Sequence, residues 1–152
     1  MSVYGDRAEA LQQEDYCCCQ CVVGSLCEEF GVDRITALRF AGAFGSGIGR
    51  SGETCGAITG AMMLIGLKMG KRLPSDPGDA RCYEVTLEFM RRFKELHDGK
   101  FKCRDLLGVD ITTDEGFDYI LENDLFTSKC RGFIRDGAEI IADMLLETER
   151  DV

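Results

Sequence analysis

The sequence lacks an apolar run long enough to cross a bilayer. Its longest apolar stretch, residues 61–67, is interrupted by Gly66, whereas a transmembrane helix needs about 20 consecutive apolar residues. The opening MSVYGDRAEALQQEDY has no apolar core of the kind that secretion signals carry. We therefore expect a soluble, cytoplasmic protein with no membrane partner.

Basic residues are too few for a nucleic-acid partner to be expected. Of the 152 residues, 18 are Lys or Arg and 27 are Asp or Glu, so the formal net charge is -9. Such a charge repels a phosphate backbone, and the basic residues are scattered along the sequence. The GSGIG segment lacks the lysine and the preceding strand of a phosphate-binding loop, so we expect no nucleotide site there.

Strand patterns and internal repeats are absent, whereas apolar residues recur at helical spacing. We predict an all-α fold: a single domain over residues 1–152, built as a bundle of about five to seven helices with a buried central helix. The predicted helices are residues 7–30 with Asp6 as cap, a short helix after Asp33, and residues 55–70, 80–97, 103–108 and 129–148, with 117–121 as a further candidate.

The central helix is expected over residues 55–70, which are apolar on nearly all sides. Thr54 predicts its N-cap, and we expect Glu53 to complement the helix dipole rather than to accept a proton near the helix start. Gly56 and Gly60 lie one turn apart and free one face for another helix or a cofactor. The same face suits a homodimer seam as well as an intramolecular crossing.

Nine cysteines are present, a high count for a reducing compartment, where stapling disulfides have no role. Four of them lie in CCCQC, residues 17–21. Each step along a helix turns by about 100°, so these four thiols cannot all face one ion. Cys17 and Cys21 form an i, i+4 pair that suits metal chelation or an oxidised pair, and equally suits small residues at a packing seam.

Three later cysteines have settings typical of reactive or ligating thiols. Cys55 is predicted on the first turn of the central helix, where the dipole and free N–H groups stabilise a thiolate. Cys103 and Cys130 each lie between two basic residues. Cys27 and Cys82 have no such setting and are predicted to pack as small apolar residues.

These segments together give the chain a resemblance to a known family. CGAITG, residues 55–60, follows the glycine-rich GSGIGRSGET and resembles the central motif of the redox-active protein family named after the pattern C_GCAxxG_C_C. CRDLLG at Cys103 and CRGFIRDGAEI at Cys130 follow in the family's order. In the family, the first segment usually reads like NCAQAV. The cysteine of that motif aligns with Cys18 of this chain. The resemblance covers residues 16–146, nearly the whole chain.

The resemblance implies a redox protein, acting with a redox partner protein, in which Cys18, Cys55, Cys103 and Cys130 are the functional thiols. It also implies that Cys19 and Cys21 replace small packing residues. The family is similar to a domain of the split-Soret cytochromes, where the related helical unit is associated with an iron–sulfur centre beside covalent haem. Because CxxCH does not occur in this chain, we expect no covalent haem.

Three hypotheses for function follow. The favoured one is electron transfer through an iron–sulfur cluster, most simply 2Fe–2S, with these four cysteines as ligands and nearby Lys and Arg offsetting its charge. The second is a thiol–disulfide protein with reversible bridges among the same cysteines and Cys55 as the attacking thiol. The third is a structural zinc site or a helical interaction module. His97, the only histidine, is expected at the surface rather than as a ligand.

Overall fold

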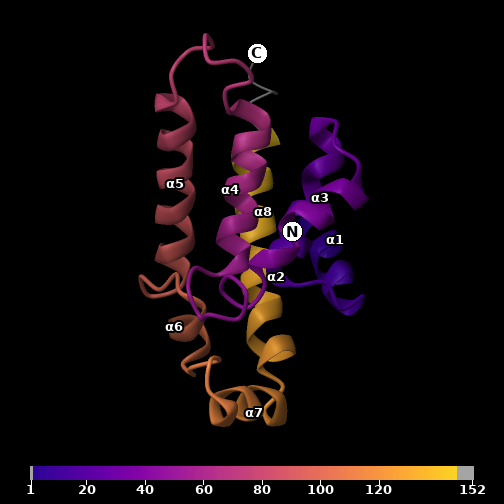
Figure 1. The fold of residues 1–152 in the computed structure, drawn as a ribbon, viewed down its shortest axis with the longest axis vertical. Helices are drawn as coiled ribbons and strands as arrows, with labels where there is room; N and C mark the ends of the chain where they lie inside the picture. The colour runs from indigo at the N-terminus through magenta and orange to yellow at the C-terminus, as the bar shows by residue number, and fades with distance from the viewer. Residues whose placement is uncertain (1, 147–152) are drawn as a thin grey trace.

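The computed structural model describes residues 2–146, which form eight α-helices (Figure 1). Short 3-10 turns at Cys27–Phe30 and Gly42–Phe44 and a π-helical turn at Phe126–Cys130 extend them. Within the described range there is no strand, only an isolated bridge between Thr54 and Lys102. The all-α prediction is confirmed, and the predicted count of five to seven helices is too low. The helices are α1 Val3–Gln13, α2 Cys18–Leu26, α3 Arg34–Ala41, α4 Gly56–Met69, α5 Ala80–Leu96, α6 Cys103–Leu107, α7 Asp114–Glu122 and α8 Arg131–Leu146.

The single long helix predicted over residues 7–30 is in fact two helices. Asp15 adopts a left-handed φ of 68°, which a right-handed helix cannot continue through. Cys17 then caps α2, and its backbone N–H donates to Oε1 of Gln20 at 3.0 Å, as in a capping box. Gln20 is therefore the residue in CCCQC that signals a helix start.

The start of α1 also differs from the prediction. Ser2, not Asp6, is the N-cap, and its hydroxyl accepts from the Gly5 N–H at 3.4 Å. Asp6 lies inside α1, where its carboxylate accepts from Arg135 of α8 at 2.6 Å. The same guanidinium donates to Glu9 at 2.8 Å. These two ion pairs connect α1 to α8.

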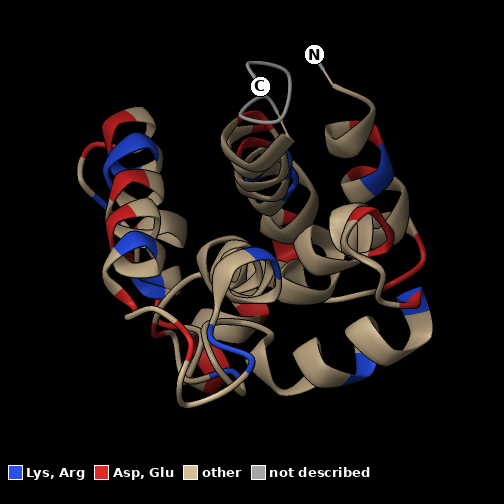
Figure 2. Ribbon diagram, turned by 90° about the horizontal axis from the view of Figure 1, so that it is seen from above, with Lys and Arg blue, Asp and Glu red and all other residues tan. Residues whose placement is uncertain are grey.

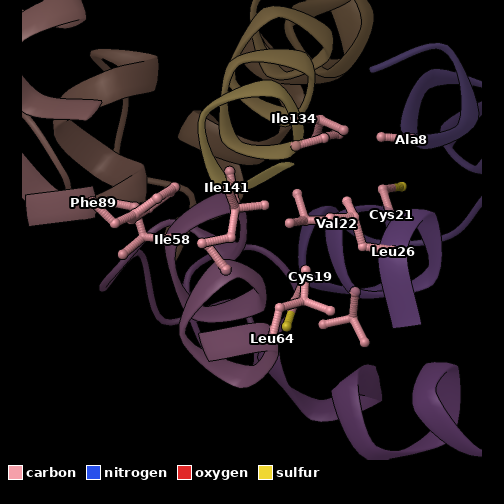
Figure 3. Packing of buried hydrophobic residues seen from close by; sticks show 14 of the residues in the cluster. Ala8, Cys19, Cys21, Val22, Leu26, Ile58, Leu64, Phe89, Ile134 and Ile141 are labelled. Atoms are coloured by element: carbon pink, nitrogen blue, oxygen red, sulfur yellow. The ribbon is translucent and has the colours of Figure 1, made fainter. Parts of the chain in front are cut away.

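The centre of the bundle is shared between helices instead of belonging to one buried helix. α4 packs against α2, α5 and α8, but it exposes Gly66 and Leu67 on its far side. The helix predicted to be central and buried is therefore buried on one side only. Side chains from α2, α4 and α8 interdigitate in the core, joined by Phe89 of α5 and Ala8 of α1 (Figure 3). The labelled core residues of the three central helices are Cys19, Cys21, Val22, Leu26, Ile58, Leu64, Ile134 and Ile141.

α2 crosses α4 where two glycines leave no side chain. A Cβ at Gly60 would lie 2.8 Å from the Cys19 carbonyl oxygen and 3.0 Å from the Val22 Cβ. A Cβ at Gly56 would lie 2.6 Å from the Cys19 nitrogen. The predicted close approach at these glycines is confirmed, and the approaching partner is a helix of the same chain.

The later helices follow the predictions more closely. α5 ends one residue before the predicted end, and its stripe of Val85, Phe89 and Phe93 is buried. α7 occupies the candidate segment and is capped by Thr113. α8 begins at Arg131 because the residues before it form the π-helical turn, and its predicted end at residue 148 lies outside the described residues.

Charged residues cover the outer faces of the helices. Along α5, acidic and basic residues alternate (Figure 2), and Glu88 pairs with both Arg91 at 2.9 Å and Arg92 at 2.8 Å. None of the helices in residues 2–146 combines the length and the apolar character that a membrane span requires.

Replacing Gly60 by Ala should destabilise the fold, because the new methyl group must push α2 away from α4. Overpacking of this kind costs about 1–3 kcal/mol. Gly66→Ala is the matched control on the same helix, since its Cβ meets nothing within 4 Å and Ala is favoured over Gly inside a helix by up to about 1 kcal/mol. The free energy of unfolding of each variant is measured by urea unfolding, monitored by circular dichroism. Equal free energies for the two variants would contradict the close crossing.

Candidate functional site

The isolated bridge between Thr54 and Lys102 positions two of the predicted cysteines. The Cys103 N–H donates to the Glu53 carbonyl at 2.6 Å, and the Cys55 N–H makes the reciprocal bond across the bridge at 2.9 Å. From this bridge the chain enters α4 with Cys55 as the N-cap and α6 with Cys103 as the first residue. Two cysteines far apart in sequence thus start neighbouring helices.

The other two predicted cysteines are placed by helix ends. Cys18 is the first residue of α2, and the close crossing brings its Cβ within 2.8 Å of where a Cβ on Gly56 would lie. Cys130 is the last residue of the π-helical turn before α8. Gln12 of α1 donates to the Phe126 carbonyl at 2.7 Å and holds the start of this turn. Such turns are rare and often occur at functional sites.

All four predicted cysteines line one small cavity. Its volume is about 20 Å³, enough for about one water-sized species. Cys55, Cys103 and Cys130 are buried and Cys18 is partly buried. Among the described residues no Asp, Glu or His lines the cavity, so sulfur is its dominant polar element. The other lining residues are Ser46, Gly47, Gly56, Leu106, Leu107, Phe126 and Phe133.

The thiols of Cys18 and Cys130 are hydrogen-bonded to each other. This bond lowers the pKa of Cys18, against the opposing effect of burial. The same bond and then burial raise the pKa of Cys130 far above its ordinary value. Cys18 is therefore the thiol of this pair that ionises first, with Cys130 as its hydrogen-bond donor.

Cys55 does not have the low pKa that its position at a helix start predicted. Burial, followed by the neighbouring Cys18 thiol, raises the pKa of Cys55 well above its ordinary value, although the N–H groups of Ala57 and Ile58 oppose this. Burial also raises the pKa of Cys103 to about 11. The low pKa predicted for Cys55 is wrong, because the apolar cavity disfavours an isolated charge more than the helix start favours it.

The two residues predicted to support the start of α4 have other contacts. Thr54 forms the bridge, and Cys55 takes the N-cap position. The Glu53 carboxylate does not cap the helix; it lies 3.1 Å from Nη2 of Arg104 and 3.8 Å from Nζ of Lys102. Two of the basic residues expected to offset a cluster's charge are therefore already partly neutralised, leaving one net positive charge beside Cys103.

The remaining five cysteines lie outside the cavity lining. Cys19, Cys21 and Cys27 are fully buried in the core, as expected of packing residues, and burial raises the pKa of Cys19 to about 12. Cys18 and Cys21 stand in CxxC spacing, yet the Cys21 thiol donates to the Tyr16 carbonyl at 3.4 Å. All nine cysteines are free thiols.

Cys17, proposed with Cys21 as an accessory pair, lies at the end of the turn between α1 and α2. It is the N-cap of α2 with an extended ψ of 165°, and its carbonyl accepts from the Cys21 N–H at 2.9 Å. Its thiol lies 3.9 Å from the Ala41 carbonyl oxygen, and burial raises its pKa. Cys17 and Cys21 thus use different carbonyl acceptors.

Residues 46–50 form a left-handed turn at the cavity, where the glycine-rich sequence predicts a loop or a very close helix contact. These five consecutive residues have φ between 51° and 69°, and each non-glycine in this conformation costs about 1–2 kcal/mol. Ile48, at 66°, is β-branched and so especially disfavoured. The available signal was the alternation of glycine at positions 45, 47 and 49.

His97 is not at the surface as expected. Its side chain is 14% exposed, and its ring lies between those of Phe93, at 4.6 Å, and Phe133, at 5.0 Å between centroids. Its Nε2 lies 3.0 Å from Oδ2 of Asp136. Since Phe133 also lines the cysteine cavity, an aromatic ring separates this pair from the thiols, and His97 is not among the lining residues.

The thiols are not arranged around a single point. In residues 2–146, no three His, Cys, Asp or Glu side chains have the geometry to hold one metal ion. A tetrahedral zinc ion needs all its sulfur ligands at about 2.3 Å. A two-iron cluster instead takes two thiolates on each iron, and the cavity offers one hydrogen-bonded pair, Cys18 and Cys130, and one bridge-linked pair, Cys55 and Cys103.

The fold and site define an all-α protein with a buried four-thiol cavity, and the family comparison agrees. The chain belongs to the family described as "Putative redox-active protein (C_GCAxxG_C_C)", whose model matches residues 16–144. The resemblance to this family, including its extent along the chain, is thereby confirmed. No curated protein and no solved structure shows a significant match to the chain.

The hydrogen bond between Cys18 and Cys130 predicts selective alkylation of the reduced apoprotein. Because the thiolate is the nucleophile, iodoacetamide should modify Cys18 with a midpoint pH below that of an ordinary cysteine. Cys130→Ala removes the donor and should slow the reaction of Cys18 at neutral pH about tenfold, which corresponds to one pKa unit. Cys82→Ala is the control. Peptide mapping by mass spectrometry reads out each site; an unchanged Cys18 midpoint in Cys130→Ala would contradict the pairing.

Proposed function

We propose that this protein transfers electrons through a 2Fe–2S cluster held by Cys18, Cys55, Cys103 and Cys130. One observation carries the proposal: four thiols from four separate segments line a single enclosed cavity, while the other five cysteines lie elsewhere. Four cysteine thiolates are the ligand set of such a cluster. Membership in a redox-active family supports the same class of function.

The chemistry of the lining fits a sulfur-ligated iron centre. Thiolates without carboxylate or imidazole neighbours select soft or iron–sulfur centres over oxygen-preferring ions. The cavity of about 20 Å³ holds about one water-sized species, so a cluster requires the thiols to turn and the Cys18–Cys130 hydrogen bond to open. A bound cluster supplies one-electron transfer.

The surrounding residues determine how the thiols accept such a centre. Ligation removes the thiol protons, and the raised pKa values of Cys55, Cys103 and Cys130 mean that cluster affinity increases with pH. Arg104 and Lys102 carry two positive charges, and the Glu53 carboxylate paired with them carries one negative charge. These three residues therefore leave one net positive charge to offset the anionic site. The apolar lining excludes water, and a reducing compartment such as the cytoplasm keeps the thiols available.

A dithiol function is the second candidate, because Cys18 and Cys130 are in hydrogen-bond contact and the pKa of Cys18 is lowered. Cys18 thiolate would attack an external disulfide, and the Cys130 thiol would then displace the mixed disulfide. The two protein thiols are thereby oxidised to a Cys18–Cys130 disulfide. The external disulfide takes up the two electrons and leaves as two thiols. This function uses two of the four thiols and leaves Cys55 and Cys103 without a role.

Anaerobic reconstitution with ferrous iron and sulfide tests the cluster. We expect visible charge-transfer absorption and about two irons and two sulfides per chain, as a 2Fe–2S centre requires. Cys55→Ala and Cys103→Ala should lose the cluster, whereas Cys27→Ala and Cys82→Ala are matched controls that should keep it. Thermal unfolding of each apoprotein shows that the variants are folded.

Two results would contradict the proposal. One is colourless, iron-free protein after reconstitution, with a reversible loss of two free thiols on oxidation; this favours the dithiol function. The other is stoichiometric zinc whose removal by a chelator destabilises the fold, which favours a structural metal site.

A further inference from the structure

Two backbone donors at the cysteine cavity have no acceptor in the part of the chain that the structure describes. They are the peptide N–H groups of Ser46 and Gly47, and both residues line the cavity. Gly47 is buried and Ser46 is partly buried. Buried N–H groups without an acceptor are rare in folded proteins, so the Gly47 N–H calls for a partner, and the Ser46 N–H lies beside it.

The carbonyl groups of the loop show which way these N–H groups point. The carbonyls of Gly45 and Ser46 accept from the N–H groups of residues 50 and 52, at 3.0 and 3.2 Å. The peptide bonds are trans, and a trans peptide turns its N–H opposite to its C=O. The Ser46 and Gly47 N–H groups therefore point away from residues 50–52, which form the returning limb of the loop.

The loop backbone is fixed against Cys103. A Cβ at Gly47 would lie 2.7 Å from the Cys103 Cβ, so only glycine permits this approach. Arg104, the next residue along α6, donates to the carbonyls of Ser51 at 2.8 Å and Gly52 at 3.1 Å. The two donors are thereby held at a set position relative to a predicted ligand.

We propose that the N–H groups of Ser46 and Gly47 form an anion nest that donates hydrogen bonds to the sulfur atoms of the centre held by the four cysteines. The inference rests on the proposed function and adds the residues that tune it. Successive N–H groups in a turn conformation bind anions, including iron–sulfur centres. Hydrogen bonds to the sulfurs stabilise the more negative, reduced form, so the nest raises the reduction potential.

An ester bond in place of the Gly47 peptide bond removes this one donor from the intact chain. A synthetic segment of residues 27–54 carrying glycolate at position 47 can be joined at two native cysteines, Cys27 and Cys55. Glycolate at position 49 is the matched control, because Gly49 belongs to the same turn but lies outside the cavity lining.

After reconstitution with iron and sulfide, we expect the position-47 ester to favour the oxidised form about tenfold more than the unmodified protein. For a one-electron couple this is about 59 mV of lower potential. The position-49 ester should keep the original potential. Equal potentials in all three proteins, each with an intact cluster, would overturn the nest and leave the proposed function standing.

A label without any change of covalent structure gives an independent readout. With ¹⁵N only at Gly47, pulsed electron paramagnetic resonance of the reduced centre should show a nitrogen coupling, and with ¹⁵N only at Gly49 it should not. Equal signals at the two positions would overturn the nest. Failure of the unmodified protein to bind a cluster would overturn both this inference and the proposed function.

Discussion

The crossing of α2 over the side-chain-free face of α4 is the contact on which the site depends. Because Gly56 and Gly60 allow backbone approach, the first residue of α2, Cys18, comes to the start of α4. The bridge at Thr54 then adds Cys103, and the π-helical turn before α8 adds Cys130. Four thiols line one cavity because four helix ends lie around it, and each end is held by contacts that do not involve the thiols themselves.

The electrostatics of the cavity follow from this enclosure. Burial raises the pKa of Cys55 and Cys103, and the bond to Cys18 followed by burial raises that of Cys130. The pKa of Cys18 alone among the four is lowered, chiefly by its hydrogen bond with Cys130. Neutral thiols suit an apolar cavity, whereas thiolates need a cation or a donor to offset their charge. The strained turn over residues 46–50 places backbone N–H donors at the cavity. This role gives a reason for the conformational strain that the turn stores.

Sequence reasoning succeeded where local pattern and cysteine order carry the information. The stripe of α5 follows from apolar spacing, and the order of four motifs, not the density of CCCQC, indicated which thiols meet. Features that depend on tertiary packing could not be predicted from the sequence. The left-handed Asp15 divides the first helix, and burial reverses the pKa expected of Cys55. His97 packs between two phenylalanines in spite of its place at a helix end.

We infer that the four thiols hold two bridged irons. Iron X-ray absorption of the anaerobically reconstituted protein tests this most directly, because it reports the atoms around each iron. A 2Fe–2S centre predicts a first shell of sulfur alone, with a second iron as the next neighbour. A first shell containing nitrogen or oxygen, or the absence of a neighbouring iron, would contradict it.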